Sequence, residues 1–199
     1  MRKYLLTAGL CSLLFCGVYS AAQDYSKAEV FAGYSFLHAD TDATGIPNQI
    51  PAGFNADFTY YFFHFLGGTA DFQYHEKKYG GGTPQNACAG FPCGDAHLIN
   101  FHAGPRFKAR VGKAEPFGHA LLGFTHGGFN PNGGTSFSND AFSTKLGAGL
   151  DYALTHHFAV RIAEANFYYT KFKVTDRFNL NGGTHQNNFI LSTGVVFRP

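Results

Sequence analysis

Apolar and polar residues alternate with a period of two along most of this chain. In residues 29–36, for example, the even positions are apolar or aromatic and the odd positions are mostly polar or small, with Phe31 as the exception. Such alternation predicts β-strands with one polar and one apolar face. Eight segments show it, the fifth of them weakly: residues 29–36, 55–62, 70–74, 99–107, 117–125, 145–152, 158–172 and 188–198.

The connections between these segments alternate in length. Three are short turns, and four are long loops rich in Gly, Pro, Asn, Asp and Thr. That order predicts an antiparallel up-and-down meander with both chain ends on the short-turn side. The short turns are residues 64–66, 109–115 and 153–157, and the long loops are residues 38–52, 76–95, 127–139 and 173–186.

Composition restricts the chain to an all-β class. Hydrophobic residues make up 45% and aromatic residues 17% of the 199 positions, which excludes a disordered chain. The 25 Gly residues and the scarcity of Glu disfavour a helix-rich fold. After Gln23 no uncharged apolar run approaches the roughly 18 residues of a transmembrane helix. Any crossing of a membrane by the rest of the chain would therefore use strands.

Two kinds of closed barrel fit alternating strands, a soluble lipocalin-like barrel and a membrane barrel. The interior of an eight-stranded barrel is only wide enough for its own side chains, so the bulky apolar face would overfill it. We therefore predict an eight-stranded antiparallel up-and-down transmembrane β-barrel with that face toward lipid. Two aromatic girdles follow, with Phe62, Phe107, Tyr152, Phe158 and Phe197 at the short-turn end and Phe36, Tyr74, Phe124 and Phe142 at the other.

Residues 1–22 have the anatomy of a secretory signal peptide. A basic pair precedes the apolar residues 5–18, and small residues at 20–22 offer a cleavage site. An uncleaved N-terminal membrane helix is the alternative. Cleavage leaves residues 23–199 as one β-barrel domain with 13 Lys and Arg against 13 Asp and Glu. This balance argues against nucleic acid as a partner.

Four short motifs stand on the predicted strands: VFAGYSF at residues 30–36, AGPRF at 103–107, LGAGLDY at 146–152 and STGVVF at 192–197. They resemble segments of small OmpA-like outer-membrane β-barrel proteins of Gram-negative bacteria, and the resemblance covers nearly all of the chain after the signal. It implies a location in the bacterial outer membrane, with outer-membrane lipids and the barrel-assembly machinery as partners. OmpA itself carries a second, peptidoglycan-binding domain after the barrel, whereas this chain stops at Pro199, so cell-wall tethering is not carried over. Such barrels also commonly end on an aromatic residue, and here Phe197 is followed by two more residues.

Charged residues on the polar faces predict an ion-paired lumen. Opposite charges in a narrow, poorly hydrated interior stabilise each other more than they would on a surface. Strict alternation after Arg161 would turn Glu164 and Asn166 toward lipid, so we expect a β-bulge near Ala163 that returns both to the interior. The predicted network consists of Glu29, Asp57, Asp71, Arg106, Lys145, Asp151, Arg161 and Glu164.

Two cysteines remain once the signal is removed. Cys88 and Cys93 lie five residues apart in a long loop, and an even pair in an exported protein predicts a disulfide. Three histidines, His97, His102 and His119, are candidates for lining the lumen. No spacing motif supports a zinc site among them, so a polar lining is the favoured interpretation.

The candidate chemistry does not favour an enzyme. Some outer-membrane barrels of this size resemble lipid A-modifying enzymes with a Ser and a His on the outer wall, and the nearest match here is His126 with Ser136 or Ser138. The Gly-rich loop segments open no helix, so they are not cofactor loops. We expect no catalytic residue, metal or cofactor.

The favoured function is a structural or surface-interaction role in which the long loops meet an unidentified extracellular ligand. A narrow pore for small solutes is the alternative. A lipocalin-like carrier and a lipid A-modifying enzyme are further alternatives.

Overall fold

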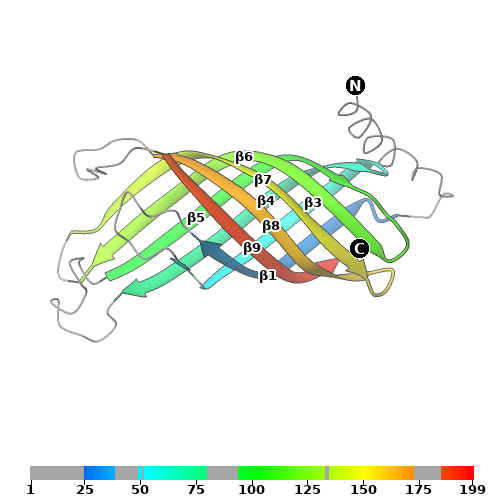
Figure 1. Cartoon of the computed structure of the whole chain (residues 1–199), viewed down its shortest axis with the longest axis horizontal. Helices are drawn as coiled ribbons and strands as arrows, with labels where there is room; N and C mark the ends of the chain where they lie inside the picture. Colours follow the sequence, from blue (N-terminus) through cyan, green and yellow to red (C-terminus); the bar gives the residue numbers. More distant parts are fainter. Residues whose placement is uncertain (1–24, 39–48, 51, 80–93, 133–134, 173–184) are drawn as a thin grey trace, which may run out of the picture.

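Nine strands among the described residues form one antiparallel sheet that closes on itself. The computed structural model describes residues 25–38, 49–50, 52–79, 94–132, 135–172 and 185–199. Neighbouring strands pair in the order β2, β1, β3, β4, β5, β6, β7, β8, β9, and β1 also pairs with β9, so that β1 and β3 to β9 close an eight-stranded barrel (Figure 1). The bounds are β1 Ala28–His38, β2 Gln49–Ile50, β3 Ala52–Phe63, β4 Leu66–Tyr79, β5 Gly94–Lys108, β6 Ala114–Pro131, β7 Phe137–Ala153, β8 Phe158–Phe172 and β9 His185–Phe197.

Side chains alternate between the lumen and the outer wall. In β1, Glu29 and Phe31 are buried whereas Val30 is exposed. The same contrast holds around the barrel, where Asp71 is completely buried and Phe62 is 64% exposed. The predicted eight-stranded antiparallel barrel, with its polar face inward and its apolar face outward, is therefore confirmed. Within the part of the chain that the structure describes, no helix is long and apolar enough to span a membrane.

Several strands are longer than the alternation predicts. β4, β6 and β7 extend toward the long-loop end well beyond the predicted residues 70–74, 117–125 and 145–152 (Figure 1). β2 lies inside the predicted loop 38–52, where it pairs with the end of β1. These extensions continue toward the loops, where both faces of a strand can meet water. Alternation is not required there, and the sequence pattern therefore misses them.

Two of the short turns depend on particular residues. In the turn between β5 and β6, Gly112 has a φ of 64°, a conformation that favours glycine, and Val111 pairs with Ala114 across it. In the turn between β7 and β8, the hydroxyl of Thr155 accepts a hydrogen bond from the backbone N–H of Phe158. These turns hold the strand ends that carry part of the lumen network.

The pairing of β8 is irregular where the sequence predicts a bulge. The register between β8 and β9 shifts between Arg161 and Glu164, and the register between β7 and β8 shifts at Asp151. Arg161, Glu164 and Asn166 are all completely buried. An extra residue in β8 therefore keeps both Arg161 and the acidic Glu164 inside the barrel.

Candidate functional site

The lumen holds most of the buried charge of the described residues. These side chains come from strands all around the barrel, and each is at most 7% exposed. The acidic ones are Glu29, Asp57, Asp71, Glu115, Asp151 and Glu164, and the basic ones are Arg106, Lys108, Lys145, Arg161 and Arg198.

Arg161 is the centre of this network. Its guanidinium donates to Asp57 at 2.7 Å, to Asp151 at 2.9 Å and to Glu164 at 2.5 Å. Three carboxylates thus surround one guanidinium. Because Arg161 carries a single positive charge, it cannot neutralise all three by itself. A second guanidinium, that of Arg106, donates to both carboxylate oxygens of Asp57 at 2.9 and 3.0 Å. This two-point contact fixes the orientation of both groups.

Two aromatic side chains that point into the lumen pack against these cations. The guanidinium of Arg161 lies 4.0 Å from the ring centre of Phe31 and 4.4 Å from that of Phe117. Arg106 lies 4.7 Å from the ring of Phe117. Cation–π contacts of this kind are strengthened by removal from water. Phe31, the exception in the alternation of β1, is therefore a packing partner of the central arginine.

A second layer of ion pairs closes the short-turn end of the lumen. Lys108 donates to Glu29 at 2.5 Å and to Asp151 at 2.8 Å, which joins this layer to the Arg161 cluster. The guanidinium of Arg198 donates to both carboxylate oxygens of Glu115 and lies 3.1 Å from Glu29. Partial burial opposes the charge of Arg198, but Glu29 and Glu115 outweigh it and raise its pKa above the ordinary value.

Three members of this layer were not predicted from the sequence: Lys108, Glu115 and, in its role, Arg198. Lys108 and Glu115 lie at the strand ends beside the β5–β6 turn, where the sequence predicts a turn beginning at Ala109 and a strand beginning only at Phe117. Extending the alternation by one residue beyond Phe107 would have placed Lys108 inside, whereas the weak alternation of residues 117–125 gives no such guide for Glu115. The alternation of residues 188–198 already puts Arg198 on the polar face. Its acidic partners, however, come from β1 and β6 and are distant in sequence.

Nearer the long-loop end than the Arg161 cluster, Lys145 donates to Asp71 at 2.7 Å. His102 lies beside them, with Nδ1 3.7 Å from Asp71 Oδ1 and Nε2 2.9 Å from Ser143 Oγ. Thr125 and Tyr168 continue the polar contacts from Ser143 toward the long-loop end.

The order Asp71, His102, Ser143 resembles the order of groups in a serine hydrolase, but the geometry does not support one. The 3.7 Å separation is too long for a hydrogen bond, and Asp71 is already paired with Lys145. Ser143 is completely buried, so its hydroxyl is closed to substrate in this structure. These contacts are those of a buried polar lining.

The structure places each predicted network residue in the lumen, in two groups. Asp71 pairs with Lys145 in one group. The other group contains Arg161, Arg106, Asp57, Asp151 and Glu164, with Glu29 joined to it through Lys108.

The histidines divide between the two faces. His102 and His119 line the lumen, and His119 contacts Asn166 at 2.7 Å. The expectation that His97 lines the lumen is wrong, because its ring packs near that of the partly exposed His126 on the outward face. Among the described residues no group of three or more His, Cys, Asp or Glu side chains is arranged to hold a metal ion.

The remaining candidate residues have other surroundings. His126 pairs with Asp140 at 2.6 Å, rather than standing as the partner of a nucleophilic serine. Cys88 and Cys93 lie outside the described residues, as do residues 1–22. The disulfide and the signal peptide therefore remain predictions.

Comparison with known proteins assigns the chain to a family. The family of outer membrane protein beta-barrel domains matches residues 8–197. The chain belongs to this family. Together with the apolar outer wall, membership places the protein in the bacterial outer membrane, as predicted, and removes the soluble lipocalin-like carrier from consideration. No curated protein matches the chain in sequence.

Solved structures share the fold at low sequence identity. Ail, the attachment invasion locus protein of Yersinia pestis, is 20% identical, with a TM-score of 0.56 over 87% of this chain and 99% of Ail. Neisserial surface protein A is 15% identical, with a TM-score of 0.61 over 89% of this chain and 100% of its own. The outer membrane protein OprG of Pseudomonas aeruginosa is 11% identical, with a TM-score of 0.55 over 88% of this chain and 96% of its own. At these identities the similarity supports the fold alone.

Proposed function

We propose that this protein is a non-conducting outer-membrane barrel that presents its long loops at the cell surface for interaction with an extracellular ligand. The observation that carries the proposal is the set of ion pairs that cross the lumen. A filled lumen leaves no path for solutes, so function moves to the loops, which is where binding residues concentrate on rigid scaffolds.

The ion pairs connect strands that are not neighbours in the sheet. Arg161 on β8 reaches Asp57 on β3, although β9 and β1 lie between them along the wall. Lys108 on β5 reaches Glu29 on β1 and Asp151 on β7. Each of these bonds spans part of the lumen cross-section. Together with the inward rings of Phe31 and Phe117 they fill the half of the lumen nearest the short turns.

A small hydrophobic cluster lies nearer the long loops. Leu37, Tyr168 and Ile190 form a buried cluster inside the barrel, with Leu98 packed against it. These side chains take up lumen cross-section in addition to the ion pairs, while the Tyr168 hydroxyl donates to Asn100 at 2.8 Å. Solutes using a narrow pore would therefore have to pass both the ion pairs and this cluster.

The names of the structurally similar proteins are consistent with a surface role. Ail is described as an attachment invasion locus protein, and one Ail structure contains the heparin analogue sucrose octasulfate. We take outer-membrane lipids and the barrel-assembly machinery as further partners, because a barrel with this outer wall must be inserted into and surrounded by lipid. The extracellular ligand itself is not identified by these similarities.

Conductance of the purified barrel in planar bilayers tests the closed lumen. We expect no steady conductance in the intact protein. A steady, ion-selective current would contradict the proposal and favour the narrow pore.

The surface role has its own test, retention of whole cells on a heparin-coated surface. We expect retention to fall when residues 80–93 or 173–184 are replaced by a short Gly-Ser linker. Replacement of the periplasmic turn residues 110–113 is the matched control and should leave retention unchanged. Equal retention of cells carrying the intact chain and both loop variants would remove this part of the proposal.

A further inference from the structure

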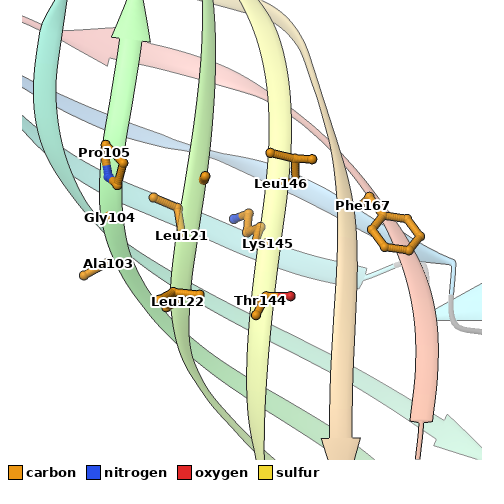
Figure 2. A pocket seen from close by; sticks show the side chains of 10 residues that line it. Ala103, Gly104, Pro105, Leu121, Leu122, Thr144, Lys145, Leu146 and Phe167 are labelled. Atoms are coloured by element: carbon orange, nitrogen blue, oxygen red, sulfur yellow. The ribbon is translucent and has the colours of Figure 1, made fainter.

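A groove of about 380 Å³ lies on the outer wall over β5, β6 and β7. Its rim is formed by Leu122, Leu146 and Phe167, which are 60%, 63% and 51% exposed. Figure 2 shows these three side chains around a floor made of small residues, including Ala103 and Gly104. A volume of this size is within the range of small-molecule binding pockets.

The groove forms where small side chains face outward on the wall. β5 and β6 keep one register through this stretch, pairing Ala103 with Leu122 and Arg106 with His119. Pro105 lies in this interval and has no backbone N–H to donate to a neighbouring strand. The small outward side chains of Ala103 and Ala120 leave a depression in a wall that elsewhere carries bulky aromatic residues.

The inner side of the groove is also apolar where it meets the lumen. Leu121 points inward and is buried, in a lumen that is otherwise mostly polar. Lys145 borders the groove, but its ammonium group is bonded to Asp71 at 2.7 Å. No uncompensated charge among the lining residues therefore faces an occupant of the groove.

The position of the groove along the barrel axis defines the medium around it. Phe107 lies two residues from Pro105 toward the short turns, and Phe124 lies two residues from Leu122 toward the long loops. Both belong to the predicted aromatic girdles and are more than half exposed. Since such girdles mark the two membrane interfaces, the groove opens into hydrocarbon.

We propose that this groove is a binding site for one acyl chain of a membrane phospholipid. A flexible hydrocarbon chain can follow the small residues of the floor, and the Leu and Phe rim restricts its lateral movement. Contacts on several sides give such a chain more dispersion attraction than the convex wall does. The site depends on the outer-membrane location and is independent of whether the lumen conducts.

The absence of tryptophan provides a direct assay. The chain contains no Trp, so a single introduced Trp reports without background. Phe167→Trp places the reporter on the groove rim. Phe58→Trp is the matched control, because Phe58 lies on β3 across the barrel and has a similar exposure of 48%. Each variant is titrated in detergent micelles with a phospholipid whose acyl chains are brominated and quench Trp fluorescence.

We expect quenching of the Phe167→Trp reporter to reach half its maximum at a several-fold lower lipid-to-detergent ratio than quenching of the control. Ala120→Phe, which fills the floor from the lipid-facing side, should remove this difference. Ala32→Phe, an outward-facing change on β1, should leave it intact. Loss of heat-modifiable migration on a gel would identify any variant that fails to fold, and Ala103→Leu then replaces Ala120→Phe.

Three results would overturn the proposal. The first is equal quenching of the two reporters, and the second is a difference that persists in the folded groove-filling variant. The third is a Phe167→Trp signal that depends on protein concentration rather than lipid, which would assign the groove to contact with a second copy of the chain.

Discussion

Removal of the Arg161 guanidinium should destabilise the barrel more than any other single change in the lumen. The side chain is completely buried and contacts the carboxylates of Asp57, Asp151 and Glu164. In Arg161→Ala these three acidic groups lose a shared cation inside a narrow lumen. Truncating one partner of a buried ion pair typically costs about 3–5 kcal/mol of folding free energy.

The remaining contacts place the expected loss within that range rather than above it. Asp57 keeps Arg106, Asp151 keeps Lys108, and Glu164 keeps a hydrogen bond from Asn166 at 2.8 Å. Of the three, Glu164 is the one left without a Lys or Arg in hydrogen-bond contact among the described residues. We therefore expect Glu164→Gln to recover part of the stability lost in Arg161→Ala, because it removes the charge that is left least compensated.

Urea unfolding in lipid vesicles, followed by circular dichroism, measures these differences. Lys78→Ala is the control, because the Lys78–Glu76 pair is exposed and such pairs contribute about 0–1 kcal/mol. Arg161→Lys should fall between wild type and Arg161→Ala, since one ammonium cannot reproduce the planar, multi-point contacts of the guanidinium. If Arg161→Ala unfolds at the same urea concentration as Lys78→Ala, the ion-paired lumen does not stabilise the barrel and the reasoning is wrong.

Three further outcomes are expected. Gly147→Ala should cost about 1–3 kcal/mol in the same urea assay, because a Cβ there would collide with the side chains of Asn166 and His119, whereas Gly118→Ala should be tolerated. Cysteines 88 and 93 should resist thiol labelling in protein exported under oxidising conditions, and their replacement by Ser should leave the barrel folded, as judged by gel migration. Trypsin added to intact cells should cut within residues 173–177 and spare the turn at 109–115, which mass spectrometry of the fragments would show.

The fold followed from the sequence because lipid enforces a simple rule. Wherever a strand crosses hydrocarbon, its outward residues must be apolar, and an eight-stranded lumen excludes the same bulky set. Alternation therefore identified each barrel strand within the membrane. It failed at the strand ends, where Lys108 and Glu115 lie beside a turn that the pattern could not delimit.

The identity of the inward aromatic residues could not be predicted from local pattern. Phe117 and Leu121 point into the lumen while small residues of β6 face outward, and this reversal explains why residues 117–125 alternate weakly. The inward position of Phe117 is stabilised by contacts with Arg106 and Arg161, which come from other strands. Such contacts connect residues far apart in sequence, and a single sequence does not reveal them.

The inward glycines contribute to the packing of the lumen together with its large residues. A Cβ on Gly33 would lie 2.7 Å from the ring of Phe31, and one on Gly149 would lie 2.5 Å from the ring of Phe117. These glycines provide the space that the two rings need in order to pack against the guanidinium of Arg161. Because ring, cation and glycine come from different strands, loss of any one leaves the others poorly packed. A barrel filled in this way gains stability at the expense of a channel, which is why we place its interactions outside the lumen, in the loops and on the lipid-facing wall.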